Sequence, residues 1–408
     1  DRCRAAAHKQ VMSEKFTGSF TQQEALPEAA IEAALSVMRH GRLRRYNVVE
    51  GELGEAALLE QEFAAQLGAK YCLAVASGGY AMATALRAVG VTHGDSVLTN
   101  AFTLAPVPGS IAAVGASPVF VDVTEELTID LEDLAAKADQ ASVLMLSHMR
   151  GHLCDMDRLM KICDDAGIIV IEDCAHTMGA AWNGVASGRM GAVGCYSCQT
   201  YKHVNSGEGG LLITDDEDIA ARAIMLSGSY MLFERHLAAP DPSAFDRIKY
   251  ETPNISGRMD NLRAAILRPQ LADLDTQVER WNARYRCVED GLRDTPGLRV
   301  INRPDAETYV GSSIQFLLLD WSADKVQEVI RRCGERGVEL KWFGGAEPVA
   351  FTSRYDSWRY ASKQSLPESD RILAGIVDMR VPLTFSLEDC ALIARIIRAE
   401  VAAVFQGG

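Results

Sequence analysis

The chain has 408 residues, which is too many for one hydrophobic core and predicts two domains, or a large domain with a smaller one. Its hydrophobic fraction of 48% and charged fraction of 24% are ordinary globular values, and they exclude a disordered, collagen-like or coiled-coil chain. The formal net charge of −14 argues against nucleic acid or an anionic membrane as a main partner. Any anionic ligand must therefore be held by local groups.

The sequence shows no targeting or membrane signal. No apolar run approaches the roughly 18 residues that a membrane span needs. Residues 1–25 are predicted to be a flexible leader, because they carry charges and small residues without the apolar core of a secretory signal. Ten cysteines are too dilute for a disulfide scaffold, and neither a second pair nor a histidine cluster completes a metal site with Cys195 and Cys198. We therefore expect free thiols, no metal and a cytoplasmic location.

The first half of the chain alternates helices with short apolar strands. Helices are expected at 24–40, 53–67, 81–89, 107–114, 131–138 and 156–166, and strands at 71–75, 96–99, 119–122, 142–147 and 168–171. Continuously apolar strands separated by helices predict a mostly parallel sheet covered on both faces.

The second half begins with a strand at 210–214 and a helix at 217–226. An irregular segment at 230–253 is long enough to reach a neighbouring subunit, and a long helix at 259–292 is predicted to bridge two domains. A strand at 312–319, a helix at 323–337 and a last helix at 387–405 then outline a smaller α+β domain. We predict a large domain over 26–265, and a bridging helix with a small C-terminal domain over 266–408.

Three short segments carry candidate chemistry, and each follows a predicted strand, where open α/β sheets bind their ligands. In the first, Ser77-Gly78-Gly79 precedes a helix, so that backbone N–H groups and the helix dipole favour a phosphate, although such a sequence is more often only a turn. In the second, Asp173 ends a buried strand. This carboxylate is either an N-cap or salt-bridge partner, or the group that keeps a cofactor's pyridine nitrogen protonated.

The third segment contains Lys202, between strand residues and a glycine-rich stretch. It is either a solvated charge or a Schiff-base lysine, whose amine must be partly desolvated to act as nucleophile and base.

Together these segments resemble the DegT/DnrJ/EryC1/StrS family, the sugar-type aminotransferases of the fold-type I pyridoxal 5'-phosphate class. The resemblance starts near Leu26 and covers most of the chain. It rests on the turn at Ser77, residues 115–123, the acidic strand end at Asp173, the lysine segment 197–210, and residues 366–367 and 381–383. It implies an α/β fold with a mostly parallel sheet in a large domain and a smaller α+β C-terminal domain.

The resemblance also implies roles for individual residues. Lys202 would hold the internal aldimine and move protons, Asp173 would pair with the pyridinium nitrogen, and His176 would lie against one face of the ring. Ser197 and the backbone around Gly78, Gly79 and Tyr80 would hold the phosphate. A subset of the family has histidine in place of Lys202 and dehydrates sugars, so the lysine favours transamination here.

Several positions depart from the family pattern. Gly79 replaces a threonine, and Leu104 replaces an aromatic residue that stacks on the ring, which leaves an apolar contact at that place. Ser256 stands where the family commonly has an asparagine that reaches the partner's phosphate. In the segment 147–152, His148 and Arg150 are candidate substrate contacts; Arg150 is a surface ion pair or a bidentate partner for a substrate carboxylate or phosphate.

The resulting hypothesis is a PLP-dependent aminotransferase of sugar biosynthesis. It would move an amino group from glutamate or glutamine to a keto group of a sugar, nucleotide sugar or cyclitol. Alternatives are transamination of a non-sugar ketone in a secondary-metabolite pathway, or a PLP-binding regulatory protein without turnover. The resemblance further implies a homodimer with shared active sites.

Overall fold

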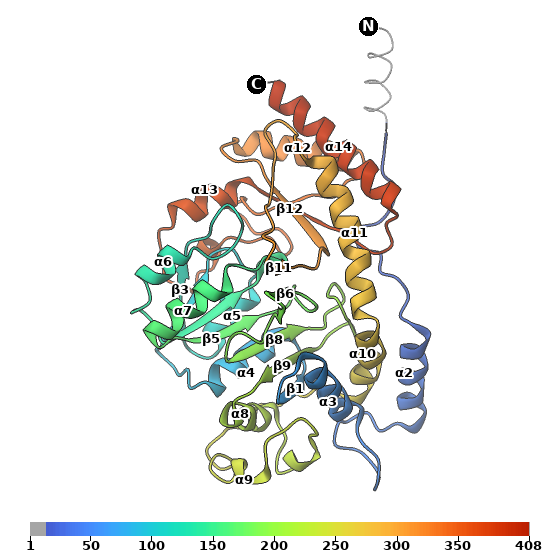
Figure 1. Cartoon of the computed structure of the whole chain (residues 1–408), viewed down its shortest axis with the longest axis vertical. Helices are drawn as coiled ribbons and strands as arrows, with labels where there is room; N and C mark the ends of the chain where they lie inside the picture. The colour runs from blue at the N-terminus through green and yellow to red at the C-terminus, as the bar shows by residue number, and fades with distance from the viewer. Residues whose placement is uncertain (1–13, 408) are drawn as a thin grey trace.

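A computed structural model describes residues 14–407, and its larger domain contains a seven-stranded sheet (Figure 1). Across the sheet the strands are β1 (Tyr71–Val75), β9 (Gly210–Thr214), β8 (Val193–Ser197), β5 (Ile169–Asp173), β4 (Val143–Ser147), β2 (Ser96–Asn100) and β3 (Ser117–Val121). Strand β9 pairs antiparallel with both of its neighbours, and the other pairs are parallel. The predicted mostly parallel sheet is confirmed.

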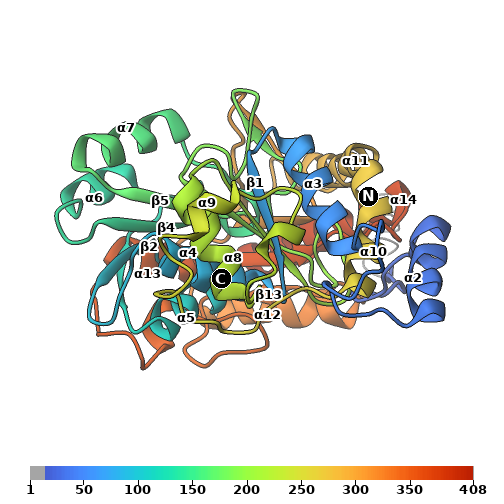
Figure 2. The same ribbon diagram turned by 90° about the horizontal axis from the view of Figure 1, so that it is seen from below.

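Helices cover both faces of this sheet, as Figure 2 shows from below. One face packs against α4 (Gly78–Ala88), α5 (Pro106–Ala113) and α8 (Glu217–Ser227). The other face packs against α3 (Glu55–Leu67), α6 (Leu131–Ala136), α7 (Met156–Ala166) and α10 (Asn261–Ala272). Apolar strand residues alternate between these two cores, so the strands are apolar throughout and the covered sheet follows from their sequence.

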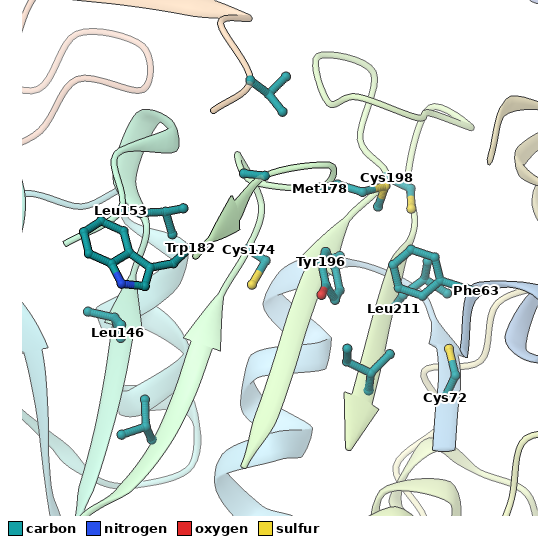
Figure 3. Close-up of a cluster of buried hydrophobic side chains, with 14 of the residues drawn as sticks. Phe63, Cys72, Leu146, Leu153, Cys174, Met178, Trp182, Tyr196, Cys198 and Leu211 are labelled. Carbon is teal, nitrogen blue, oxygen red and sulfur yellow. The ribbon is translucent and has the colours of Figure 1, made fainter. Parts of the chain in front are cut away.

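The second of these cores contains several cysteines (Figure 3). The rings of Phe63 and Tyr196 meet edge to face at 5.0 Å, and Cys72, Cys174 and Cys198 pack in the same cluster. The nine cysteines within residues 14–407 are all free, and eight of them are buried. Burial raises the pKa of the Cys198 thiol to about 12, so this thiol is a small hydrophobe at neutral pH.

The smaller domain contains the four-stranded sheet β10 (Arg299–Val300), β12 (Ser313–Leu317), β14 (Ile376–Arg380) and β13 (Lys341–Trp342). Helices α11 (Leu274–Leu292), α12 (Ala323–Glu335) and α14 (Leu387–Gln406) pack on it and share its core. Helix α13 (Pro367–Gly375) lies between this domain and the large one. Three two-residue strands, β6 (Ala181–Trp182), β7 (Val185–Ala186) and β11 (Glu307–Thr308), form a third small sheet.

The helix predicted over 259–292 is two helices that meet at Asp273. Helix α10 packs against α3 and α2 (Glu28–His40) of the large domain, whereas α11 packs against α14. The two helices thus pack in different hydrophobic cores, and the chain passes from one core to the other at Asp273. The predicted domain boundary at residue 265 falls inside α10.

The predicted flexible leader divides into two parts. Residues 1–13 lie outside the described residues. In residues 14–25, Phe16 and Phe20 are buried and meet Phe385 edge to face at 4.8 and 5.0 Å. This part is therefore packed on the small domain rather than flexible. The free energy gained by burying two phenylalanine side chains offsets the conformational entropy lost when the segment becomes ordered. Among residues 14–407, no helix has the length and apolar character to cross a membrane.

Candidate active site

The strand registers bring the three predicted segments together at the carboxyl edge of the parallel strands. Ser147 of β4 lies opposite Asp173 of β5, and Ser197 at the end of β8 lies opposite Gly210 of β9. Val75 at the end of β1 pairs with the same Gly210. A cavity opens at this edge, and its lining includes Gly78, Gly79, Leu104, Asp173, His176, Ser197 and Lys202.

One end of the cavity is the N-terminus of α4. The Ser77 side chain caps this helix by accepting a hydrogen bond from the Tyr80 N–H at 3.0 Å. The N–H groups of the first residues, Gly78 and Gly79, have no intrahelical acceptor at this position and lie at the positive end of the helix dipole. A Cβ at Gly78 would lie 2.9 Å from the Cβ of Ser197, so glycine permits this close approach.

Tyr80 does not line the cavity, because its hydroxyl donates to the carbonyls of Leu226 and Ile255 and its N–H is taken by the cap. Leu104 does line it, as an apolar wall. Ser256 lies outside it within this chain, where its hydroxyl accepts from Arg258 at 3.0 Å.

The Asp173 carboxylate is buried inside the cavity and held by two donors. The N–H of Ala175 donates to one oxygen at 3.1 Å, and the Ser147 hydroxyl donates to the other at 3.2 Å. Ser147 in turn accepts from the Thr103 hydroxyl at 2.7 Å, which fixes its direction. Burial raises the pKa of Asp173 from its ordinary value, although these donors and the Lys202 charge oppose that shift. A cation next to this buried carboxylate would therefore stabilise its ionised form.

The Lys202 amine lies 2.8 Å from Nε2 of His176. Burial, assisted by the positive charge of Arg150, lowers the pKa of Lys202 to about 7, although Asp173 opposes this shift. His176 accepts the Arg150 N–H at Nδ1 over 3.3 Å, which places its ring proton on Nε2. Burial, the Lys202 charge and Arg150 hold the pKa of His176 well below its ordinary value. A neutral histidine with its proton on Nε2 donates to a neutral amine, so the two shifts agree.

The two predicted substrate contacts have different surroundings. His148 is buried behind the cavity, where its Nε2 lies 2.8 Å from the Glu172 carboxylate. Glu172 also accepts the N–H groups of Gly188, Met190 and Gly191 between 2.6 and 2.9 Å, so this pair fastens a loop. His148 and Glu172 cluster with Cys174 at distances that suit a metal ion, but these donors already occupy the carboxylate.

Arg150 lines a second, larger cavity on the other side of Lys202 and His176. Arg380 and Tyr201, which no sequence pattern singled out, line the same cavity. Arg380 ends strand β14, immediately before the Val381-Pro382 pair that contributed to the family resemblance. A charged residue at the end of a buried strand was the available signal, but only the docked domains place it beside Lys202.

The comparisons with known proteins agree with this geometry. The model of the DegT/DnrJ/EryC1/StrS aminotransferase family matches residues 26–398. This chain belongs to that family. It is 33% identical over 291 residues to the L-glutamine:2-deoxy-scyllo-inosose aminotransferase of Streptomyces lividus, covering 70% of this chain and 66% of that one. It is also 33% identical to the pleiotropic regulatory protein of Geobacillus stearothermophilus, over 68% of this chain and 72% of that one.

The fold comparison extends over nearly the whole chain. The crystal structure of 3-amino-5-hydroxybenzoic acid synthase superposes with a TM-score of 0.80 at 25% identity, covering 96% of this chain and all of that one. Alignments to the relatives identified by sequence span between 56% and 72% of their lengths. The resemblance and the predicted fold class are thus confirmed.

Pyridoxal 5'-phosphate is the cofactor of the DegT/DnrJ/EryC1/StrS family, and the cavity's residues fit it. A buried carboxylate with a raised pKa suits a protonated ring nitrogen, and a neutral lysine amine suits the cofactor's aldehyde. The N–H groups of Gly78 and Gly79 and the Ser197 hydroxyl suit a phosphate. Leu104 and Met149 supply apolar walls for a ring. The carboxylate, the amine and the candidate phosphate donors line one cavity, as a single cofactor that contacts all three requires.

Proposed function

We propose that this chain is a PLP-dependent aminotransferase that moves an amino group from an amino acid to a keto group of a sugar, nucleotide sugar or cyclitol. The observation that supports this most strongly is the buried Lys202 amine, which lies 2.8 Å from His176 with its pKa lowered to about 7. An amine with a pKa near 7 is about half neutral at that pH, so it can act both as nucleophile and as proton carrier.

The residues of the cavity divide the work. When bound, the cofactor supplies an aldehyde that takes up the amine and a ring that draws electrons from the adjacent carbon. Asp173 would hold the protonated ring nitrogen, and the α4 N-terminus with Ser197 would hold the phosphate.

The Lys202 Nζ would remove and return the proton at the substrate carbon, and the Nε2 proton of His176 orients that amine. Apolar Leu104 and Met149 exclude water from this exchange. Both ring nitrogens of His203 have other hydrogen-bond partners, the Met178 carbonyl and the Ser312 hydroxyl, at 2.9 Å each. His203 therefore does not replace Lys202 as a base.

The substrate class is proposed from the relatives. Several are named as aminotransferases or synthases that act on keto-cyclitols or nucleotide sugars, among them the GDP-perosamine synthase of Vibrio cholerae. L-glutamine or L-glutamate is the proposed donor. The regulatory protein of Geobacillus stearothermophilus supports the alternative of a PLP-binding regulator without turnover.

We further propose a homodimer with shared active sites. Tyr230, Met231 and Tyr250 expose 52%, 54% and 83% of their surfaces, and they lie in the irregular segment at 230–253. Apolar side chains gathered on one exposed segment are typical of an interface. Ser256 follows this segment and would act on the partner's site. Sedimentation of the wild-type protein and of Tyr250→Asp tests the dimer. The free cysteines also agree with the proposed cytoplasmic location.

An absorbance spectrum tests the activity. Purified protein with PLP is expected to show a yellow band that L-glutamine or L-glutamate bleaches and a keto acid restores. Lys202→Ala is expected to lose this interconversion, whereas Lys161→Ala, at an exposed lysine, retains it. A protein that binds no PLP would refute the proposal, and a band indifferent to every donor would favour the regulator.

A further inference from the structure

Two arginines line the larger cavity, which shares Lys202 and His176 with the candidate cofactor cavity. Arg150 comes from the turn after β4, and Arg380 ends β14 in the other domain. Their guanidinium carbons lie 4.6 and 5.5 Å from the ring centre of Phe351, so both flank one aromatic side chain. Both also line the larger cavity that reaches Lys202 and His176. The docked domains therefore bring two cations to the mouth of the active site.

Arg150 is only partly satisfied by the protein. It is 7% exposed, and its Nη2 pairs with the buried Asp378 carboxylate at 2.5 Å. Its Nε has no hydrogen-bond partner among residues 14–407. The backbone of Arg150 has φ of +55°, which a non-glycine residue adopts at a cost of about 1 kcal/mol. A buried guanidinium N–H without an acceptor indicates a ligand atom that the protein does not provide.

Arg380 has no ion pair with any carboxylate within residues 14–407. Its guanidinium carbon lies 3.5 Å from the ring centre of Tyr201, so the two planar groups are in close contact. Such a contact holds the guanidinium by its face and leaves its N–H edges available. The nearby Glu339 carboxylate pairs with Lys341 at 2.5 Å instead.

We propose that Arg150 and Arg380 form a subsite for a substrate carboxylate, with Arg380 as its bidentate anchor. This inference rests on the proposed aminotransferase function and adds the recognition of one substrate group. The carboxylate belongs either to the amino donor or to a keto acceptor that carries one.

A monoanion matches the local charge. The two arginines carry two positive charges and Asp378 carries one negative charge, so the cluster has a surplus of one. A carboxylate neutralises that surplus and offers two oxygens in the plane of the guanidinium fork, whereas a phosphate dianion would overcompensate. Arg150 and Arg380 both lower the pKa of Lys202, so a bound carboxylate also favours a proton on that amine.

Glutarate tests the subsite because it has the carboxylates of glutamate but no amine to react. Calorimetric titration of the PLP-loaded protein with glutarate is expected to show binding that Arg380→Gln weakens about tenfold to a hundredfold. Arg380→Lys is expected to recover only part of this loss, because a single ammonium lacks the bidentate fork. Arg395→Gln, which removes an arginine from an exposed ion pair, is the matched control and should bind as wild type.

A second variant tests the subsite independently in case Arg380→Gln does not fold. Arg150→Gln with Asp378→Asn removes both members of the buried pair together, so that no uncompensated charge remains. It too is expected to bind glutarate at least tenfold more weakly. Unchanged glutarate affinity in Arg380→Gln or in this double variant, with the PLP spectrum of the wild type, would overturn the subsite.

The donor half-reaction distinguishes the two sources of carboxylate. If the donor's carboxylate binds here, Arg380→Gln raises the L-glutamine concentration that half-bleaches the cofactor band by the same factor as it weakens glutarate. If an acceptor's carboxylate binds here, glutarate binding falls and the L-glutamine midpoint stays. A wild-type protein that binds glutarate but reacts with no donor would refute the aminotransferase and leave the subsite standing.

Discussion

The Lys202 amine is expected to titrate near pH 7 in the cofactor-free protein. Burial removes the amine from water and thereby penalises its charged form, and the positive charges of Arg150 and Arg380 add to this effect. The negative charge of Asp173 opposes it but is itself weakened by burial, which raises the pKa of that carboxyl. The pKa therefore falls from the ordinary lysine value of 10.5 to about 7.

This shift makes the stability of the cofactor-free protein depend on pH. Between pH 7 and 10.5 the unfolded chain holds the lysine proton and the folded chain has released it, so raising the pH through this window stabilises the fold. A shift from 10.5 to about 7 corresponds to roughly 5 kcal/mol across the whole window, as an upper limit. Lys202→Met removes this pH dependence. The variant's free energy of unfolding should therefore exceed that of the wild type by the largest amount at or below pH 7.

Two measurements check the reasoning. Competitive labelling of lysine amines, read by mass spectrometry, should give Lys202 a midpoint near pH 7, whereas the exposed Lys161 reacts only at much higher pH. Urea unfolding of wild type and Lys202→Met should show stabilities that converge as the pH rises toward 10.5. A Lys202 labelling profile that parallels that of Lys161, with an unfolding difference independent of pH, would refute a desolvated amine.

Further variants test the site and the buried ion pair between Arg45 and Glu60. Ser147→Ala removes the 3.2 Å hydrogen bond to Asp173 and should weaken PLP about fivefold, for a loss of about 1 kcal/mol, in a spectrophotometric titration; unchanged affinity would contradict the Thr103–Ser147–Asp173 chain. Gly78→Ala should lower the melting temperature because its Cβ would press on Ser197 at 2.9 Å, whereas Gly79→Ala, whose nearest neighbour is at 3.9 Å, should leave it unchanged; equal melting temperatures would sink this explanation. Arg45→Met leaves Glu60 buried without its bidentate partner at 2.7 and 2.9 Å and should cost about 3–5 kcal/mol in urea unfolding, and a double variant with Glu60→Leu should recover part of that loss if the charge is the cause.

The strand ends that carry the site could be predicted from the sequence because their signals are local. The apolar runs that end at Val75 and Asp173 have no polar face, which requires a covered parallel sheet, and parallel strands present their carboxyl ends at one edge. Glycines 78 and 79 before a helix then favour an anion at that edge. The family resemblance supplied the identity of the cofactor, which these local patterns left open.

Other features depended on contacts between residues far apart in the chain. The helix predicted over 259–292 breaks at Asp273 because its halves pack on different cores, and those cores are built from residues distant in the chain. His148 was a candidate substrate contact because it directly follows a strand. In the structure it lies beside the Glu172 carboxylate, which also accepts N–H groups from the loop of Gly188 to Gly191.

The sequence by itself determined the covered sheet and the presence of a lysine and a carboxylate at its edge, because strand burial depends on near neighbours. Only the tertiary structure decided the chemistry of Lys202. The small domain places Arg380 beside it, and the closed fold removes water from the amine. A pKa depends on the surrounding charges and on solvent, and both are set here by residues that lie far apart in the chain.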